Sequence, residues 1–108
     1  MSSVIVTSMP ERDGVVVALR IADARDRRLI TVSGRVVAAH AAVIGNSPAY
    51  CCELDDGTGI LGVWFIGRDH VAGLDEGARC AVEGMVQIRH GRLIVWNPVY
   101  RLQWSDAT

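Results

Sequence analysis

Arginines and aromatic rings stand near one another in the second half of this sequence. Arg89 and Arg92 flank a His-Gly pair, and Trp64 lies in an apolar run two residues after Gly62. Guanidinium groups form forked hydrogen bonds with phosphates, and indole rings stack on nucleobases with roughly 1–3 kcal/mol for each base. This chemistry suits contact with a single strand of nucleic acid. The candidate residues are Trp64, Arg35, Arg68, Arg89, Arg92 and Tyr50.

Each of these candidates has a structural alternative. Surface arginines commonly pair with carboxylates, and the neighbours available for this are Asp69, Glu53 and Glu83. Trp64 faces outward in one strand register and fills the core in the other, because a shift of one residue exchanges the two faces. The sequence leaves both registers open, and Tyr50 has the same ambiguity. Large aromatic residues are mostly buried, so we favour core positions for Trp96 and Tyr100.

Enzymatic and metal chemistry find little support in the sequence. Asp55 and Asp56 form an acidic pair, but they precede Gly57 in a turn, where aspartate serves to accept backbone hydrogen bonds. The histidines and cysteines show none of the spacings typical of metal sites. We therefore expect no enzymatic activity, no metal and no cofactor.

Charge and cysteine content restrict the setting further. The chain has eleven Arg, no Lys and twelve acidic residues, a formal net charge of −1. Strong non-specific nucleic-acid binders carry a basic excess, so any binding is expected to be weak and local. The three cysteines are an odd number and two of them are adjacent. These features predict reduced, packed thiols and a cytoplasmic protein. No apolar run is long enough to span a membrane, and the first residues lack the basic start of a signal peptide.

The residue pattern predicts a series of β-strands. Alternating and β-rich runs occupy 29–42, 49–55, 60–66, 78–89 and 92–95, the last continuing to 102. The Asp-Gly pair at 56–57 and the His-Gly pair at 90–91 are typical of tight hairpin turns. Gly34 and Gly84 lie inside strands, where glycine marks a bulge or a sharp bend. Residues 67–77 have room for about one helical turn.

This order predicts an all-β domain, a five-stranded Greek-key OB-fold barrel with a short helix between the third and fourth strands. An SH3-like barrel is the main competitor. We assign the barrel to residues 20–104 and an N-terminal extension of uncertain structure to residues 1–19. Residues 1–13 are expected to form a loosely docked arm, 15–19 either a strand or a helix start, and 21–28 a short helical turn.

Several short motifs support this assignment, although each is weak alone. They are Val32-Ser33-Gly34-Arg35-Val36, Leu54-Asp55-Asp56-Gly57-Thr58-Gly59, Val63-Trp64-Phe65, Val82-Glu83-Gly84-Met85-Val86 and Asn97-Pro98-Val99-Tyr100. Over residues 20–102 the chain resembles the OB-fold nucleic-acid-binding family. It is similar to wedge domains of bacterial fork-reversing helicases, OB modules of aminoacyl-tRNA synthetases and small stand-alone actinobacterial OB proteins. The resemblance implies binding of single-stranded DNA or RNA through the second and third strands, with the 1–2 and 4–5 loops.

A second hypothesis comes from a different class of function. The apolar runs Val4-Ile5-Val6 and Val15-Val16-Val17 stand in the N-terminal extension. Such segments can add a strand to a partner protein or to a second copy of the chain. With its neutral-to-acidic charge, the barrel could then serve as a protein-interaction or self-assembly module without nucleic acid.

Overall fold

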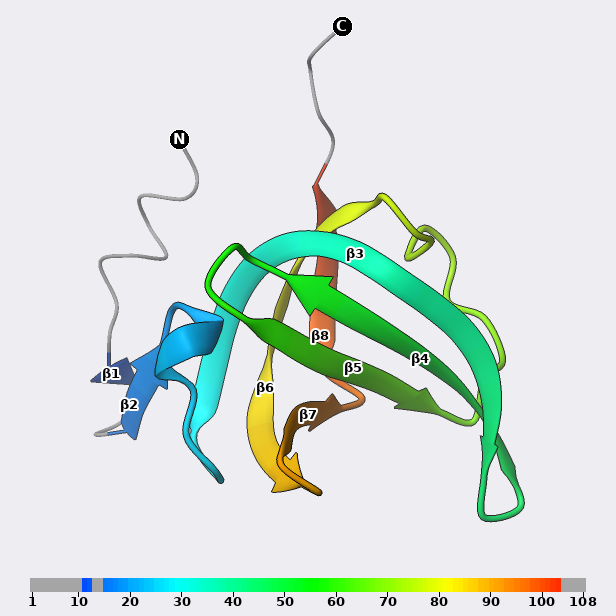
Figure 1. The fold of residues 1–108 in the computed structure, drawn as a ribbon, viewed down its shortest axis with the longest axis horizontal. Helices are drawn as coiled ribbons and strands as arrows, with labels where there is room; N and C mark the ends of the chain where they lie inside the picture. Colours follow the sequence, from blue (N-terminus) through cyan, green and yellow to red (C-terminus); the bar gives the residue numbers. More distant parts are fainter. Residues whose placement is uncertain (1–10, 13–14, 104–108) are drawn as a thin grey trace, which may run out of the picture.

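The fold is all-β, and the β class predicted from the sequence is confirmed (Figure 1). A computed structural model describes residues 11–12 and 15–103. In chain order the elements are β1 (Glu11–Arg12), β2 (Val15–Ala18), the 3-10 helix η1 (Ile21–Asp23), β3 (Leu29–Ile44), β4 (Ser47–Asp55), β5 (Ile60–Ile66), β6 (Arg79–Arg89), β7 (Arg92–Trp96) and β8 (Val99–Gln103). Among the described residues, no helix is long enough and apolar enough to cross a membrane.

Five of the strands are linked by a closed ring of pairings. β3 pairs with β4, β4 with β5, and β5 with β7 in parallel. β7 then pairs with β6, and β6 returns to β3. Three further strands extend this ring, since β2 joins β3, β1 joins β2 and β8 joins β6.

The predicted count of five strands is therefore wrong, because the described sheet contains eight. One cause is that 15–18 pairs with the start of β3 as a strand, where the sequence left strand and helix open. Another is that the last predicted strand is interrupted between β7 and β8. Asn97 has a left-handed φ of 48°, and Pro98 has no N–H to donate to a ladder. The apolar run at 4–6 lies outside the described residues.

β3 arches across the barrel and changes partner near its glycine (Figure 1). Its first part, from Leu29 to Arg35, pairs with β6, and the part from Arg35 to Ile44 pairs with β4. A Cβ atom on Gly34 would stand 2.7 Å from the carbonyl oxygen of Asp55. The close approach explains the glycine within this strand, and a register shift follows between Val36 and Ala38.

We expect Gly34→Ala to lower the free energy of unfolding by about 1–3 kcal/mol, since the added methyl group would meet backbone atoms held by strand pairing. Urea denaturation followed by tryptophan fluorescence measures the change. Ser33→Ala, at an exposed neighbouring position, is the control, and because it removes one exposed hydrogen bond from Gln103 it should shift stability by only about 0.5 kcal/mol. Equal unfolding midpoints for the two variants would contradict this account of Gly34.

The segment between β5 and β6 forms turns, so the short helix predicted within residues 67–77 is wrong. Gly67, Gly73 and Gly77 have φ values of 98°, 86° and 95°, whereas a helix needs φ near −63°. The turns still close the barrel, because Val71 and Leu74 are fully buried in the core. The core is completed by inward side chains of the strands, among them Ile30, Val32, Val36, Leu54, Leu61, Val63, Val82, Val86 and Val95.

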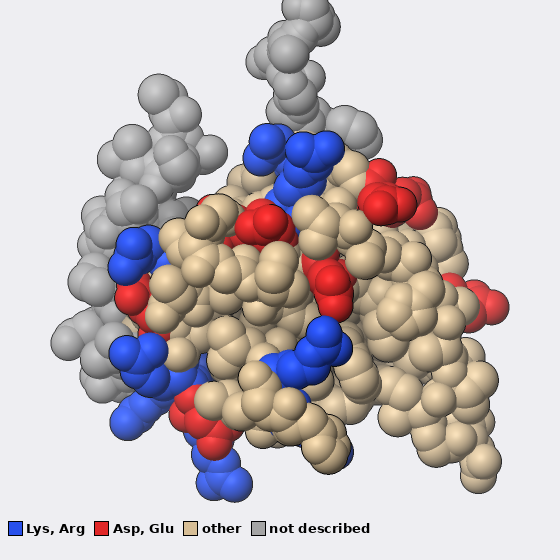
Figure 2. All heavy atoms as spheres, in the orientation of Figure 1, with Lys and Arg blue, Asp and Glu red and all other residues tan. Residues whose placement is uncertain are grey.

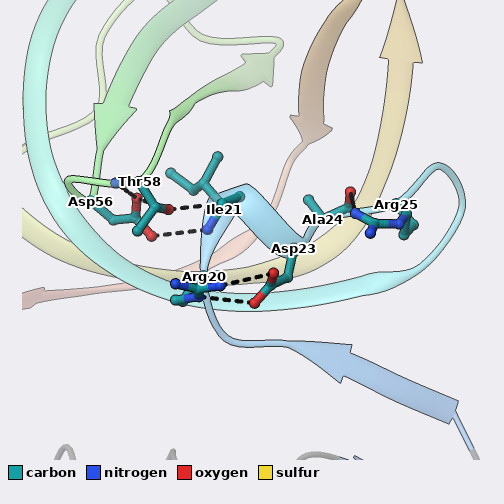
Figure 3. A network of polar contacts seen from close by, with 8 residues as sticks. Arg20, Ile21, Asp23, Ala24, Arg25, Asp56 and Thr58 are labelled. Carbon is teal, nitrogen blue, oxygen red and sulfur yellow. Dashed lines mark hydrogen bonds and ion pairs between the residues drawn. The ribbon is translucent and has the colours of Figure 1, made fainter.

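The β4–β5 turn holds η1 in place through Asp56 (Figure 3). One carboxylate oxygen of Asp56 accepts from the N–H and hydroxyl of Thr58, at 2.8 and 2.7 Å. The other accepts from the N–H of Ile21 at 2.9 Å, and the Thr58 hydroxyl accepts from Ala22 N–H. The aspartates thus act on the backbone, as predicted, and they also anchor η1, whose Ile21 is buried.

These contacts predict a pH-dependent part of the stability. Burial by itself would raise the pKa of Asp56, but the hydrogen bonds from Ile21 and Thr58 outweigh it and lower the pKa. The stabilisation is therefore present above the unfolded pKa, near 3.9, and is lost as the pH falls through the lower folded pKa. Asp56→Asn should cost about 1–3 kcal/mol at pH 7, and the cost should decrease as the pH is lowered to 3. Urea denaturation at both pH values checks this, and a cost independent of pH would contradict it.

Candidate nucleic-acid interface

Trp64 lies on the outer face of the barrel. Along β5, Leu61, Val63 and Phe65 are buried, while Trp64 and its alternate neighbours are more exposed. Of the two strand registers that the sequence left open, the structure has the one that directs Trp64 away from the core. This places its indole on the surface formed by β4 and β5, where a ligand can reach it.

Strand pairing places Trp64 in a row of four side-chain positions across neighbouring strands. His40 on β3 pairs with Cys51 on β4, Cys51 with Trp64, and Trp64 with Trp96 on β7. The two indole rings meet edge to face, with centroids 5.0 Å apart and planes at 71°. This is a favourable geometry for aromatic pairs, so Trp96 supports the orientation of Trp64.

Asn97 holds the backbone of β5 next to the Trp64–Trp96 pair. Its N–H donates to the carbonyl of Trp64 at 2.7 Å, and its side-chain oxygen accepts from Ile66 N–H at 2.9 Å. Asparagine tolerates the left-handed conformation that this position requires. The break between β7 and β8 therefore also positions Trp64.

Gly62 makes room for the indole of Trp64. A Cβ atom on Gly62 would stand 3.2 Å from the indole nitrogen of Trp64 and 3.4 Å from Ile94. The indole of Trp64 therefore occupies the space beside this glycine.

The β6–β7 hairpin brings arginines to the tryptophan pair. His90 and Gly91 have φ values of 53° and 77°, which suits a tight two-residue turn with both central residues in the left-handed region. The guanidinium of Arg89 lies 5.7 Å from the ring centroid of Trp96, within cation–π range. Arg92 stands 3.7 Å from a carboxylate oxygen of Glu53. One arginine is thus held on an aromatic face and the other beside an acid.

A cleft of about 660 Å³ lies between this hairpin and the β3–β4 hairpin. Its walls come from β3, β4, β5 and β7, and they include His40, Ala42, Ile44, Trp64, Arg92 and Ile94. The volume is within the range of small-molecule and cofactor pockets. Apart from His40, the acidic and basic residues of the lining are Glu53 and Arg92, and the other walls are mostly apolar, which suits a ligand with flat rings.

The two sides of the cleft differ in charge. Between Val36 and Cys52 the sequence has no Asp, Glu, Lys or Arg, so the β3–β4 hairpin is uncharged apart from His40. Val43, near its tip, is 75% exposed. Figure 2 shows this hairpin, at the lower right, as a region free of coloured charges, while arginines gather toward the opposite side. The cleft therefore has one wall without Asp, Glu, Lys or Arg and a second wall that carries Arg92 beside Glu53.

Comparison with known proteins shows the fold. The second OB-fold domain of replication protein A from Methanococcus maripaludis superposes with a TM-score of 0.65 at 15% identity, covering 86% of this chain and all of that domain. The chain has an OB fold. A chain in the crystal structure of yeast Stn1 and Ten1 is also similar, with a TM-score of 0.57 and 15% identity over 71% of this chain. The OB domain spans 43% of that yeast chain. No family model and no curated relative matches the sequence.

Three of the predicted site residues of this OB domain lie outside the cleft. Tyr50 is 5% exposed, and its hydroxyl donates to the carbonyl of Leu74 at 2.9 Å, so it is a core residue. Arg68 lies 5.7 Å from the ring centroid of the inward-facing Phe65. Arg35 pairs in register with Asp55 and lines shallow hollows away from Trp64. Of the six candidates, the cleft contains Trp64 and Arg92, and Arg89 lies beside it on Trp96.

Sequence reasoning missed His40 in this cleft and Trp96 beside it. His40 was considered only as a metal ligand, and its place in the cleft depends on β3, which continues beyond the predicted end at 42 to Ile44 before β4 begins at Ser47. An alternation of His40, Ala42 and Ile44 along an extended strand would have been the signal. Trp96 was favoured as core, and its position beside Trp64 depends on the parallel pairing of β5 with β7. Local sequence carries no mark of that pairing.

The three thiols of the OB domain are free and buried, as predicted. Burial raises the pKa of Cys52 to about 12 and that of Cys80 to about 11, and it also raises the pKa of Cys51. All three therefore stay protonated at neutral pH. A protonated, buried thiol is a poor nucleophile, so the cysteines act as packing residues.

Proposed function

We propose that this OB domain binds single-stranded DNA or RNA weakly in the cleft between the β3–β4 and β6–β7 hairpins. The observation that carries the proposal is the Trp64–Trp96 pair, which places one indole in the cleft and holds Arg89 over the other. An aromatic platform beside cations is the arrangement with which proteins hold single strands of any sequence. Binding, without catalysis, is the proposed activity.

The unequal walls suggest how the strand would lie. Its bases would face Trp64 and the uncharged β3–β4 hairpin, where no cation attracts a phosphate. Its phosphates would follow Arg89 and Arg92 on the β6–β7 hairpin. Because Glu53 stands 3.7 Å from Arg92, part of that positive charge is neutralised, and this agrees with weak binding.

A fluorescence-anisotropy titration tests the proposal with labelled oligodeoxythymidylate and oligouridylate at low salt. We expect dissociation constants of roughly 1–100 µM, the range of sequence-independent binding. The affinity should fall steeply as salt rises, because each phosphate contact releases counterions. Absence of a signal for both probes at the highest protein concentration would overturn the proposal.

A protein-interaction role is the second candidate, and one observation favours it. The β3–β4 hairpin is uncharged and exposes Val43, which suits contact with an apolar surface. The N-terminal route of self-assembly is less available, since Val15–Ala18 already pairs with β3 of its own chain. Light scattering after size exclusion distinguishes the roles. A dimer that Val43→Asp dissociates would support assembly, and a monomer at all concentrations would oppose it.

A further inference from the structure

A second group of arginines lies beside the cleft, in the segment that joins η1 to β3. Arg25, Arg27 and Arg28 are all exposed, and we call them the basic edge. In the sequence, Asp23 and Asp26 alternate with these arginines and reduce the net positive charge of the segment. The tertiary structure changes that balance.

Each acid has a hydrogen-bond partner, but only Asp23 is paired with a cation, so Asp26 keeps its negative charge beside the three arginines. Asp23 is paired with Arg20 through two hydrogen bonds, of 2.9 and 3.1 Å (Figure 3). Asp26 accepts a hydrogen bond from the N–H of Ile88 at 3.0 Å. By contrast, the only side-chain hydrogen bond from an arginine of the basic edge, among the described residues, is the one that Arg25 donates to the neighbouring Ala24 carbonyl. The guanidinium groups of the edge thus keep most of their donors for a ligand.

The basic edge is attached to β6 like a short extra strand. Arg27 N–H donates to the Val86 carbonyl at 2.7 Å, and Val86 N–H donates to the Arg28 carbonyl at 3.0 Å. To make these bonds Arg27 adopts a φ of 65°, a left-handed conformation that is unfavourable for a residue with a side chain. At the other end of the segment, Asp56 anchors η1. The arginines therefore occupy fixed positions.

This attachment places the basic edge next to the cleft. Val86 pairs on its other side with Val95 of β7, so two strand spacings, about 10 Å, separate the edge from β7. Arg89 follows on the same β6 strand and lies over Trp96. Figure 2 shows arginine side chains at the lower left, around η1 and the start of β3, with acidic side chains among them. Arginines therefore lie on both sides of β6, at the β6–β7 hairpin and on the basic edge, and Asp26 is bonded to Ile88 between them.

We propose that the basic edge binds the phosphates of nucleotides that flank those held in the cleft, and so lengthens the binding track beyond the β6–β7 hairpin. This inference rests on the proposed function, because it needs a strand in the cleft. The ligand is the sugar-phosphate backbone of a single strand longer than the cleft itself can hold. The edge would add affinity without adding sequence preference, since phosphates carry no sequence information.

Two labelled oligodeoxythymidylates, of about 4 and about 16 nucleotides, test the track, since these lengths bracket the site sizes of single OB folds. The variant is Arg27→Asn with Arg28→Gln, because asparagine tolerates the left-handed backbone of position 27. For the long probe we expect roughly tenfold weaker binding at 50 mM salt and a salt slope smaller by about 1.4, as two lost phosphate contacts predict. The short probe should bind as before.

Two further variants make the result specific. Arg79→Gln with Arg101→Gln removes the same charge at exposed positions on β6 and β8, and it should leave the difference between the probes unchanged. Arg25→Gln with Arg28→Gln leaves position 27 intact and should repeat the loss for the long probe. Two outcomes would overturn the proposal for the basic edge. One is an equal loss of affinity for both probes, and the other is the same loss of affinity for the long probe in the Arg79 and Arg101 variant.

Trp64→Ala distinguishes failure of the track from failure of the proposed function. If Trp64→Ala weakens the binding of both probes while the basic-edge variants weaken the binding of neither, the cleft binds the strand and the proposal for the basic edge is wrong. If it weakens neither probe, the cleft does not bind the strand and both proposals are overturned.

Discussion

Trp64→Ala should weaken the binding of a labelled single strand by roughly 5-fold to 150-fold, which corresponds to the loss of one stacked base at about 1–3 kcal/mol. The indole lies in the cleft, and no other Trp, Tyr or Phe side chain lines the cleft among the described residues. Alanine removes the stacking surface without opening a hole in the core, because Trp64 lies on the outer face of β5. Anisotropy titrations at fixed low salt measure the change.

Trp64→Phe is the matched control for this prediction. A phenyl ring retains a flat face for stacking, so most of the affinity should return. The unfolding midpoints of both variants, measured in urea, show whether the fold is intact. Equal affinities for the alanine variant and the wild-type chain, with an unchanged midpoint, would contradict a stacking role for Trp64.

Arg89→Gln combined with Arg92→Gln should have the second large effect. Glutamine retains hydrogen-bonding groups while it removes two charges from the hairpin. If each arginine contacts one phosphate, the slope of log affinity against log salt should fall by about 1.4 for a single strand. The affinity should therefore fall most at low salt and little at high salt, and titrations across a salt series measure this.

Glu53→Gln should change the affinity in the opposite direction, because Glu53 lies next to Arg92. Its carboxylate stands 3.7 Å from Arg92, so removing it should free that guanidinium and strengthen binding at low salt. Because both substitutions lie on the surface of one cleft, opposite effects would be difficult to explain by altered folding. A salt slope that neither variant changes would show that the hairpin does not contact phosphates.

The regular elements of this protein follow well from local sequence. Alternating apolar residues in β5 and turn residues such as Gly57 and Gly91 predict strands and hairpins, because both depend on neighbours in the chain. The helix predicted at 67–77 is wrong because its glycines occupy left-handed conformations. Tyr50 was placed at the interface because strand alternation alone does not say which face is buried. Its hydroxyl instead bonds to Leu74, twenty-four positions away.

By itself the sequence determined an all-β chain, buried thiols, and the two residue types, tryptophan and arginine, that suit a single strand. Only the tertiary structure decided which of them meet. The parallel pairing of β5 with β7 brings Trp64 to Trp96, and the hydrogen bonds of the basic edge to Val86 bring Arg27 and Arg28 beside β6. The physical reason is that these contacts join segments far apart in the chain. Backbone pairing and the shared burial of the core establish them, and no local pattern of residues encodes such a pairing.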